Sequence, residues 1–420
     1  MKINIERLER NLFNLAKIGK NETGGIDRAL GSEEDREARK WLINYWKGQT
    51  GMPVRIDAVA NMWVRREGGG DEPGMLAPIV LGSHHDAVPN GGMYDGALGV
   101  LAATEVLQTL IDHNIQTRHP IEVVSFTGEE PNPYNVSTLG SKVLSGRLKK
   151  TDLQQLKSVK DNSSLADCIE KIGGNIELAD NILIKPGDIS AFMELHIEQG
   201  KRLYSLQESS ANVTCITGIY RENITVLGDA NHGGTTIMQD RQDALLAASE
   251  LNLEFEKILK KINSPEVVGT IGYLVVYPNA VSNIPGKVEL VLEIRTCISG
   301  IVTFITDKLT VIAKKIEERR KVTIDRKVNL DQQAMPMDET VQNAIRRGIK
   351  SLELPVYDYV SMAGHDAANM QRVTRAGMIF TQSVDGKSHC PGERTRIEDI
   401  GRTVNAMLAA VLILDKELDL

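Results

Sequence analysis

The sequence has 420 residues, of which 41% are hydrophobic and 25% charged, and its formal net charge is −7 at pH 7. This length and composition are ordinary for a globular protein of two or three domains with a substantial core. The negative balance and the absence of a long basic run argue against nucleic acid as a partner. No run of about 18 apolar residues occurs, so a membrane-spanning helix is not expected.

The sequence begins with a charged segment and contains four widely spaced cysteines. Residues 1–10 have the pattern of an amphipathic helix, whereas a signal peptide has an uninterrupted apolar centre. The cysteines form no paired motif. They are Cys168, Cys215, Cys297 and Cys390. We therefore expect a cytoplasmic protein with free thiols.

The first part of the sequence predicts helices and then buried strands. Residues 1–66 fit two amphipathic helices and a strand ending at 61–66, and a glycine-rich turn follows at 67–74. Continuous apolar runs further along are typical of strands that are buried on both faces. These runs are 78–81, 121–126 and 191–195.

Helical patterns lie between these strands. A helix is expected at 96–110, and the polar, mostly helical segment 141–187 is interpreted as a surface insertion. The same pattern resumes at residue 329, with another buried strand at 375–381. The alternation predicts an α/β domain with a mainly parallel sheet.

From about residue 212 the sequence predicts a different kind of unit. Alternating strands and two helices follow in the order ββαββαβ, and the first two strands are expected to pair. The expected elements are 212–220, 222–227, 243–262, 267–276, 287–295, 301–319 and 321–328. This order predicts a ferredoxin-like α+β lid or dimerisation domain at 212–328, inserted into a catalytic, metal-binding domain of 1–211 and 329–420.

Four of the buried strands end in loops that carry histidines and carboxylates. The residues are His84, Glu129, Glu130, His196 and His389. Open α/β sheets bind ligands at the carboxyl ends of their strands, so these loops can converge. Together with Asp95 they provide the nitrogen and oxygen ligands that zinc or a similar divalent ion prefers.

The residue types also suggest separate roles. Two metal ions need a bridging ligand, which a carboxylate can provide and an imidazole cannot, and Asp95 at the start of a helix is the candidate. Asp86 is two residues after His84 and can accept its second ring N–H. Glu129 and Glu130 are adjacent and point differently, so one can bind metal while the other carries a proton.

Each of these residues taken singly has an ordinary structural explanation. A His-x-Asp sequence is commonly a capped turn, and a Glu-Glu pair is commonly a solvated surface. Here they occur together, each just after a buried strand, in a chain with only eight histidines. The combination favours one shared metal site.

Six segments, in order along nearly the whole chain, resemble a known family. They are 82–96 (GSHHDAVPNGGMYDG), 194–200 (ELHIEQG), 230–236 (ANHGGTT), 278–281 (PNAV), 363–367 (AGHDA) and 385–389 (DGKSH). They resemble the N-carbamoyl-L-amino acid hydrolases. That family also holds β-ureidopropionases and allantoate amidohydrolases and is related to the aminoacylase-like dinuclear metallopeptidases.

The resemblance implies two divalent metal ions in each chain, with zinc preferred and manganese, cobalt or nickel as alternatives. It implies that His84 and Glu130 bind one side of the metal pair, that Asp95 bridges, and that Glu129 is the general base. The remaining implied metal ligands are His196 and His389. The implied substrate-binding residues are Gln199, His232, Asn279, Arg295, Gly364 and His365.

The expected reaction is metal-assisted hydrolysis of the carbamoyl (ureido) C–N bond of a small N-carbamoyl amino acid. Glu129 takes a proton from the attacking water, His232 donates to the oxyanion, and Arg295 with Asn279 pairs with the substrate carboxylate. Without the family pattern, His232, Asn279 and Arg295 are explained as turn and surface residues. The family's lid often completes the site of a second subunit, which implies a homodimer through the lid.

Other readings remain open. A second hypothesis keeps the site and changes the substrate to allantoate, or to the amide of an aminoacylase or dipeptidase substrate. A non-catalytic metal-binding or dimer scaffold is opposed by the intact ligands and Glu129. Four departures from the family pattern bear on the substrate: His85 for an aliphatic residue, Gly128 before the glutamate pair, residues 131–134 after it, and Ile237 for a proline.

Overall fold

The structure is a computed structural model that describes residues 1–69 and 76–418, so most of the turn predicted at 67–74 lies outside the described residues. The chain forms two compact units. The first comprises Met1–Thr214 and Met337–Leu420, and the second is the continuous segment Cys215–Pro336. The sequence placed the inserted segment at 212–328, and the second unit extends further because β14 (Thr323–Gln332) and β15 (Met335–Pro336) continue beyond that limit.

The first unit is built on a sheet with a parallel centre. Its four central strands run parallel in the order β17 (Ala376–Thr381), β7 (Ala191–Ile197), β4 (Ile79–His84) and β6 (Ile121–Phe126). All of their residues are buried, as the continuous apolar runs predict. The mixed α/β fold with a largely parallel central sheet is thereby confirmed.

Antiparallel strands extend this sheet on both sides. β8 (Ser210–Ile216) pairs with β17, and β16 (Asp358–Ser361) pairs with β8. On the other side, β3 (Met62–Arg66) pairs with β6, and β2 (Val54–Ile56) pairs with β3. The parallel arrangement is therefore confined to the centre, where the ligand-bearing loops begin.

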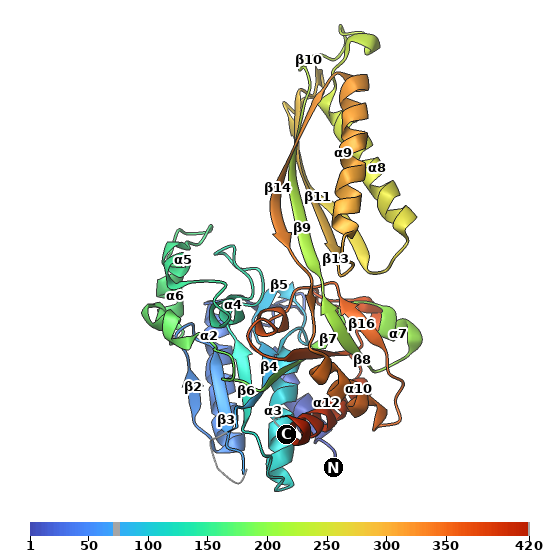
Figure 1. The fold of residues 1–420 in the computed structure, drawn as a ribbon. Coiled ribbons are helices and arrows are strands. Elements are labelled where there is room, and N and C mark those ends of the chain that lie inside the picture. Colours follow the sequence, from blue (N-terminus) through green and yellow to red (C-terminus); the bar gives the residue numbers. More distant parts are fainter. Residues whose placement is uncertain (70–75, 419–420) are drawn as a thin grey trace. The chain divides into compact units, whose positions relative to one another are not determined.

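Five helices contribute to the main core of the first unit. They are α1 (Ile5–Ala16), α2 (Glu33–Thr50), α3 (Ala97–Asp112), α10 (Glu339–Lys350) and α12 (Ile397–Glu417). Helix α3 is buried over its first fourteen residues, and Trp46 of α2 donates from Nε1 to Thr104 Oγ1 at 2.8 Å. Figure 1 shows α3, α10 and α12 next to the sheet.

The segment predicted as a surface insertion has an apolar cluster of its own. Its elements are α4 (Leu139–Leu144), α5 (Lys150–Gln155), α6 (Leu165–Lys171) and the 3-10 helix η1 (Ile176–Ile182). These pack on Leu30, Val59 and Ala60. The shorter elements of the unit are β1 (Ile26–Arg28), β5 (Ala87–Gly91), α7 (Arg202–Leu206), α11 (Ala367–Met370) and η3 (Val384–Gly386).

The second unit is a four-stranded antiparallel sheet with two helices. Its main elements are β9 (Gly218–Leu227), α8 (Ala244–Ile262), β11 (Val267–Tyr277), β13 (Lys287–Thr296), α9 (Ile301–Arg320) and β14. The sheet order is β11-β13-β9-β14, which with the βαββαβ chain order is a ferredoxin-like topology. Buried residues alternate along β13, and α8 and α9 lie side by side on the buried face (Figure 1). Shorter elements are β10 (Asn231–His232), η2 (Met238–Asp240) and β12 (Asn283–Ile284).

The predicted pairing of 212–220 with 222–227 is wrong. β8 and β9 belong to different sheets, and β9 pairs with β13 and β14 instead. A hairpin needs a reversing turn, and no turn pair such as Asn-Gly lies between these runs.

Among the described residues, no helix is long and apolar enough to cross a bilayer.

Candidate metal centre

The loops that follow the four central strands bring the predicted ligands together within the first unit. One group contains His84, Asp95 and His196, and a second contains Asp95, Glu130 and His389, with the ligand atoms of each group within 4.8 Å of one another. Asp95 belongs to both groups. The family resemblance implied that His84 and Glu130 bind the same side of the metal pair, whereas in the structure His84 groups with His196, and Glu130 groups with His389.

Each oxygen of Asp95 faces a different group. Asp95 Oδ1 lies 3.6 Å from His84 Nε2 and 3.2 Å from His196 Nε2. Asp95 Oδ2 lies 3.3 Å from His389 Nε2, which is 3.4 Å from Glu130 Oε1. Ligand atoms that each lie ~2.0–2.2 Å from one tetrahedral zinc ion are separated by roughly 3.3–3.6 Å. The spacing therefore fits two ions that share Asp95.

The free electron pairs of the ligands also fit a cation. His196 Nε2 and Glu130 Oε1 are buried and have no hydrogen-bond partner among the described residues. The other ring nitrogens are used: His84 Nδ1 donates to the Asp86 carbonyl at 3.1 Å, and His196 Nδ1 donates to the Ile197 carbonyl at 3.0 Å. These bonds leave the Nε2 electron pair of each ring for a metal ion.

Asp86 meets His84 through two oxygens. Its backbone carbonyl accepts a hydrogen bond from His84 Nδ1 at 3.1 Å, and its carboxylate Oδ1 lies 3.5 Å from the same nitrogen. The Asp86 carboxylate accepts the backbone N–H groups of Glu129 at 3.2 Å and Glu130 at 3.1 Å. Asp86 therefore fixes the turn that carries both glutamates.

Burial and mutual charge shift the acidities in the site. Burial first, and then the Asp95 charge, raises the pKa of Glu130 to about 7. Burial alone would raise the pKa of Asp95, but His196 and His389 hold it well below its usual value. The hydrogen bond to Asp95 raises the pKa of His389 to about 9. Further buried carboxyl groups are Asp86, Glu129, Glu194, Asp366 and Glu393. Divalent cations would compensate this concentration of negative charge.

Glu129 is close to the ligands but belongs to neither group. Its Oε2 lies 3.7 Å from His84 Nε2, and burial raises its pKa well above the usual value, with Glu130 adding to the effect. A buried carboxyl group beside a metal centre can exchange protons with a reacting molecule. This placement is consistent with the base predicted from the sequence.

Unusual backbone geometry occurs where the ligand loops meet. Gln199 and His389 have positive φ angles of 56° and 55°, and such strain is frequent at functional sites. Gln199 Nε2 donates to Asp95 Oδ2 at 2.6 Å. Gly96 has φ 64°, and a Cβ there would lie 2.3 Å from the His84 ring. Glycine at the start of α3 therefore leaves room for the His84 ring.

The predicted substrate residue His365 lies against His196. The His365 ring meets the edge of the His196 ring at a centroid distance of 4.5 Å, and its Nε2 lies 2.8 Å from Ser361 Oγ. Burial, aided by the charge of His196, keeps the pKa of His365 well below its usual value. A Cβ at Gly364 would meet nothing within 4 Å. Gln199 and His365 are thus both beside the ligand groups.

Two residues at the centre were not predicted. Ser388 Oγ donates to Asp95 Oδ2 at 2.8 Å, and Glu393 accepts the backbone N–H of Asp95 at 3.0 Å. Their proximity to His389 in the sequence was the available signal. His85, which stands where the family usually has an aliphatic residue, points away from the ligand groups. Its Nε2 lies 2.8 Å from Asp35 Oδ1, and its Nδ1 lies 2.7 Å from Ser125 Oγ.

The predicted substrate residues of the second unit occupy two ends of its sheet. His232 is exposed, and its Nδ1 accepts the N–H groups of Gly234 and Thr235. The exposed Asn279 follows β11 at the end where Tyr277 pairs with Lys287. Arg295 bonds to Glu293 and lies eight positions from Lys287, about 27 Å along the strand.

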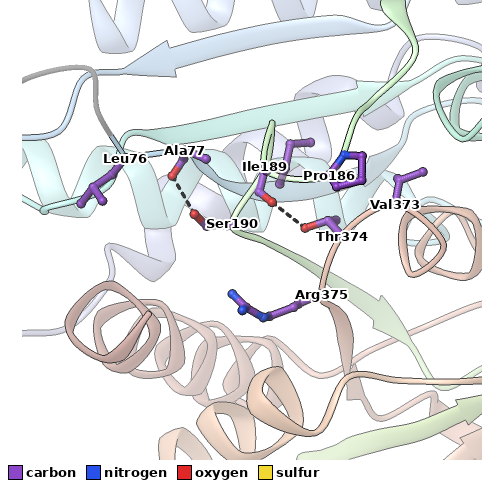
Figure 2. Close-up of a pocket in the computed structure, with 9 residues that line it drawn as sticks. Leu76, Ala77, Pro186, Ile189, Ser190, Val373, Thr374 and Arg375 are labelled. Atoms are coloured by element: carbon purple, nitrogen blue, oxygen red, sulfur yellow. Dashed lines mark hydrogen bonds between the residues drawn. The ribbon is translucent and has the colours of Figure 1, made fainter. Parts of the chain in front are cut away.

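A cavity of about 410 Å³ lies at the opposite ends of the central strands (Figure 2). It is lined by residues that precede β4, β7 and β17, including Ala77, Ser190 and Arg375. Ser190 Oγ donates to the Ala77 carbonyl at 3.1 Å, and Thr374 Oγ1 donates to the Ile189 carbonyl at 2.8 Å. This cavity is separate from the metal centre.

Comparison with known proteins identifies the family. The profile of peptidase family M20/M25/M40 matches residues 80–413. The N-carbamoyl-L-amino acid amidohydrolase of Geobacillus stearothermophilus is 34% identical over 94% of each chain. The allantoate amidohydrolase of Escherichia coli is 30% identical over 96% of each chain. A crystal structure of a hydantoinase/carbamoylase family amidase from Burkholderia multivorans has a TM-score of 0.91 at 31% identity, covering 99% of both chains.

These relatives confirm the resemblance seen in the sequence motifs. Their similarity extends over almost the whole chain, including the segments that carry the ligand groups. The chain therefore belongs to peptidase family M20/M25/M40, among its amidohydrolases, and is a hydrolase of C–N bonds in non-peptide substrates.

Proposed function

We propose that the protein hydrolyses the carbamoyl C–N bond of a small N-carbamoyl amino acid with two divalent metal ions. The proposed metal ligands are His84, Asp95, Glu130, His196 and His389. The observation that supports this best is Asp95, whose two oxygens face two separate ligand groups. A buried glutamate that belongs to neither group, Glu129, lies beside them.

In this proposal Glu129 moves the protons. When bound, the divalent ions lower the pKa of water and polarise the substrate carbonyl. Glu129 accepts a proton from the water that attacks the ureido carbon and returns it to the departing amino nitrogen. Its burial stabilises the protonated form and so favours this transfer. The carbamate product then decomposes to ammonia and carbon dioxide.

Substrate binding would use residues from both units. A guanidinium such as Arg295 can pair bidentately with the substrate carboxylate, aided by Asn279, and His232 can donate from Nε2 because its Nδ1 is an acceptor. The spacing of about 27 Å along β13 prevents one copy of the second unit from placing Arg295 beside Asn279 around a small molecule. We therefore propose that His232 and Asn279 come from the partner in a homodimer.

The edge strand β11 supports such a dimer. β11 is at one edge of the second unit's sheet, and Tyr273 is 52% exposed and Leu274 43% exposed. An exposed apolar edge strand is readily covered by an identical chain. We propose that the two chains meet through their second units, with the edge strand β11 at the contact.

The test is a substrate panel. Protein loaded separately with zinc, manganese or cobalt is given N-carbamoyl amino acids, allantoate, N-acyl amino acids and dipeptides, and release of ammonia and free amine is measured. Turnover of the N-carbamoyl amino acids above all others is expected. Preferred turnover of allantoate would support the second candidate, which the 30% identical relative from Escherichia coli favours. Turnover of acyl or peptide substrates alone would refute the carbamoyl proposal.

A further inference from the structure

Glu393 connects the two loops that carry Asp95 and His389. It lies between His389 and α12, and only 4% of its surface is exposed. Glu393 Oε1 accepts the backbone N–H groups of Tyr94 at 2.8 Å and Asp95 at 3.0 Å. Glu393 Oε2 lies 3.1 Å from the hydroxyl oxygen of Ser388. The three partners are Asp95, the residue before it (Tyr94), and the residue before His389 (Ser388).

The Asp95 loop is shaped to receive this carboxylate. A Cβ at Gly92 would lie 2.0 Å from the carboxyl carbon and Oε1 of Glu393. Gly92 is not among the residues with positive φ, so its backbone conformation does not require glycine. The close approach of Glu393 is the reason for a glycine at this position. The contact is therefore specific to these two residues.

Ser388 extends the connection to the metal ligands. Its hydroxyl lies 2.8 Å from Asp95 Oδ2 and 3.1 Å from Glu393 Oε2, between the two carboxylates. Glu393 thus holds the backbone of Asp95 directly and reaches its side chain through Ser388. None of these contacts places Glu393 against a reacting atom, since Oε1 and Oε2 are both used by the loops.

We infer that Glu393 is a positioning residue that holds Asp95 in the orientation in which its two oxygens face two ligand groups. The inference rests on the proposed function, because it assigns what orients the proposed bridging ligand. A backbone amide that is held by a buried carboxylate cannot rotate freely, so the direction of the Asp95 side chain is fixed before a metal ion binds. Loss of Glu393 should therefore weaken metal binding.

The experiment measures binding of Zn²⁺ alone to the metal-free full-length protein by competition with a chelating dye. Removing a residue that orients a metal ligand typically costs about 10–100-fold in metal affinity, which is the loss expected for Glu393→Ala. Glu393→Gln retains an oxygen that can accept both N–H groups, and its affinity should stay within about threefold of wild type. The matched control is Glu398→Gln, because Glu398 is exposed in the first turn of α12.

Gly92→Ala provides an independent test without removing the carboxylate. It should weaken Zn²⁺ binding in the wild-type background and have little further effect in the Glu393→Ala background, because the obstructing atoms are then absent. Circular dichroism and the visible spectrum of the Co²⁺-loaded variants report folding and ligand geometry. If Glu393→Ala does not fold, Gly92→Ala decides the question.

The outcomes separate the inference from the proposed function. Wild-type protein that binds no Zn²⁺ would refute the proposed two-metal function and this inference with it. Wild-type protein that binds Zn²⁺, together with folded Glu393→Ala or Gly92→Ala variants that bind it equally well, would refute only the role of Glu393. Weakened binding with an altered Co²⁺ spectrum would support it.

Discussion

At the scale of single residues, two adjacent glutamates differ in their contacts. Glu130 lies 3.4 Å from His389 and belongs to a ligand group, whereas Glu129 belongs to none. Glu129→Gln should therefore keep its fold and metal content but lose roughly 10²–10⁴-fold in turnover, the usual contribution of general-base catalysis. Elemental analysis and steady-state kinetics check this. The control is Glu130→Gln, which should lose metal as well, and near-normal turnover of Glu129→Gln would show that another group is the base.

A second residue, Asp35, bears on stability rather than catalysis. It is fully buried and accepts hydrogen bonds from Arg39, His85 and the Gly31 N–H. Although burial would raise the pKa of Asp35, Arg39 and His85 hold it below its usual value. A lowered pKa in the folded state stabilises the protein above the unfolded value, about 3.9, and this contribution is lost as the pH falls below it.

Asp35→Asn should consequently unfold at lower urea concentration than wild type at pH 7. The difference should shrink at pH 3, because the wild-type contribution is then being lost. The midpoint of urea unfolding at each pH is the measurement. The exposed Asp307 serves as the control, since Asp307→Asn should change the midpoint little at either pH. An equal loss of stability for Asp35→Asn at both pH values would contradict the argument.

The residue scale also shows what the sequence could predict. The five proposed ligands could be predicted because each follows a buried strand or opens a helix. Glu393 lies close to His389 in the sequence, but its contact with Asp95, 298 positions away, could not be predicted. The same holds for His85 and Asp35, which are 50 positions apart. A carboxylate that binds a distant backbone amide leaves no periodic pattern in the sequence.

At the scale of elements, the start of α3 decides whether His84 can face Asp95. Gly96 has φ 64°, and a Cβ there would meet the His84 ring at 2.3 Å. Gly96→Ala should weaken Zn²⁺ binding and lower the unfolding temperature, since a left-handed backbone costs a non-glycine residue roughly 1–2 kcal/mol. Zinc titration and thermal unfolding check this.

The control for Gly96→Ala lies in α2. A Cβ at Gly48 would meet nothing within 4 Å, and this glycine is helical. Gly48→Ala should therefore stabilise the protein by up to about 1 kcal/mol without changing Zn²⁺ binding. If both variants bound Zn²⁺ like the wild type, the glycine at α3 would have no part in placing His84.

Elements also explain which parts of the fold were predictable. The strands β4, β6, β7 and β17 were found because a continuous apolar run requires burial on both faces. The run at 212–227 was misread because alternation identifies strands but not their partners. β8 pairs with β17, whose residues are over 150 positions further along the chain. Strand partners of this kind are set by the packing of the whole unit.

At the scale of the whole molecule, the proposed dimer predicts complementation between two inactive variants. Glu129→Gln lacks the base and His232→Ala lacks the proposed partner residue, so a mixed dimer contains one complete site. Dissociating, mixing and reassociating the two should restore about a quarter of wild-type activity if pairing is random. The controls are each variant reassociated alone. Mixed dimers that form but remain inactive would show that each site is built from one chain.

The way in which the second unit joins the chain has a consequence for protein engineering. Its first residues, Cys215 and Ile216, pair in register with its last residues, Pro336 and Met335. Paired residues on neighbouring strands are about 5 Å apart. A segment whose ends are this close occupies the place of a tight turn, so its presence need not disturb the sheet of the first unit. We therefore expect that the segment between these ends can be exchanged without rebuilding the first unit. Another compact unit with the same end spacing could be grafted there, and substrate preference could change by exchanging the insert while the metal ligands stay as they are.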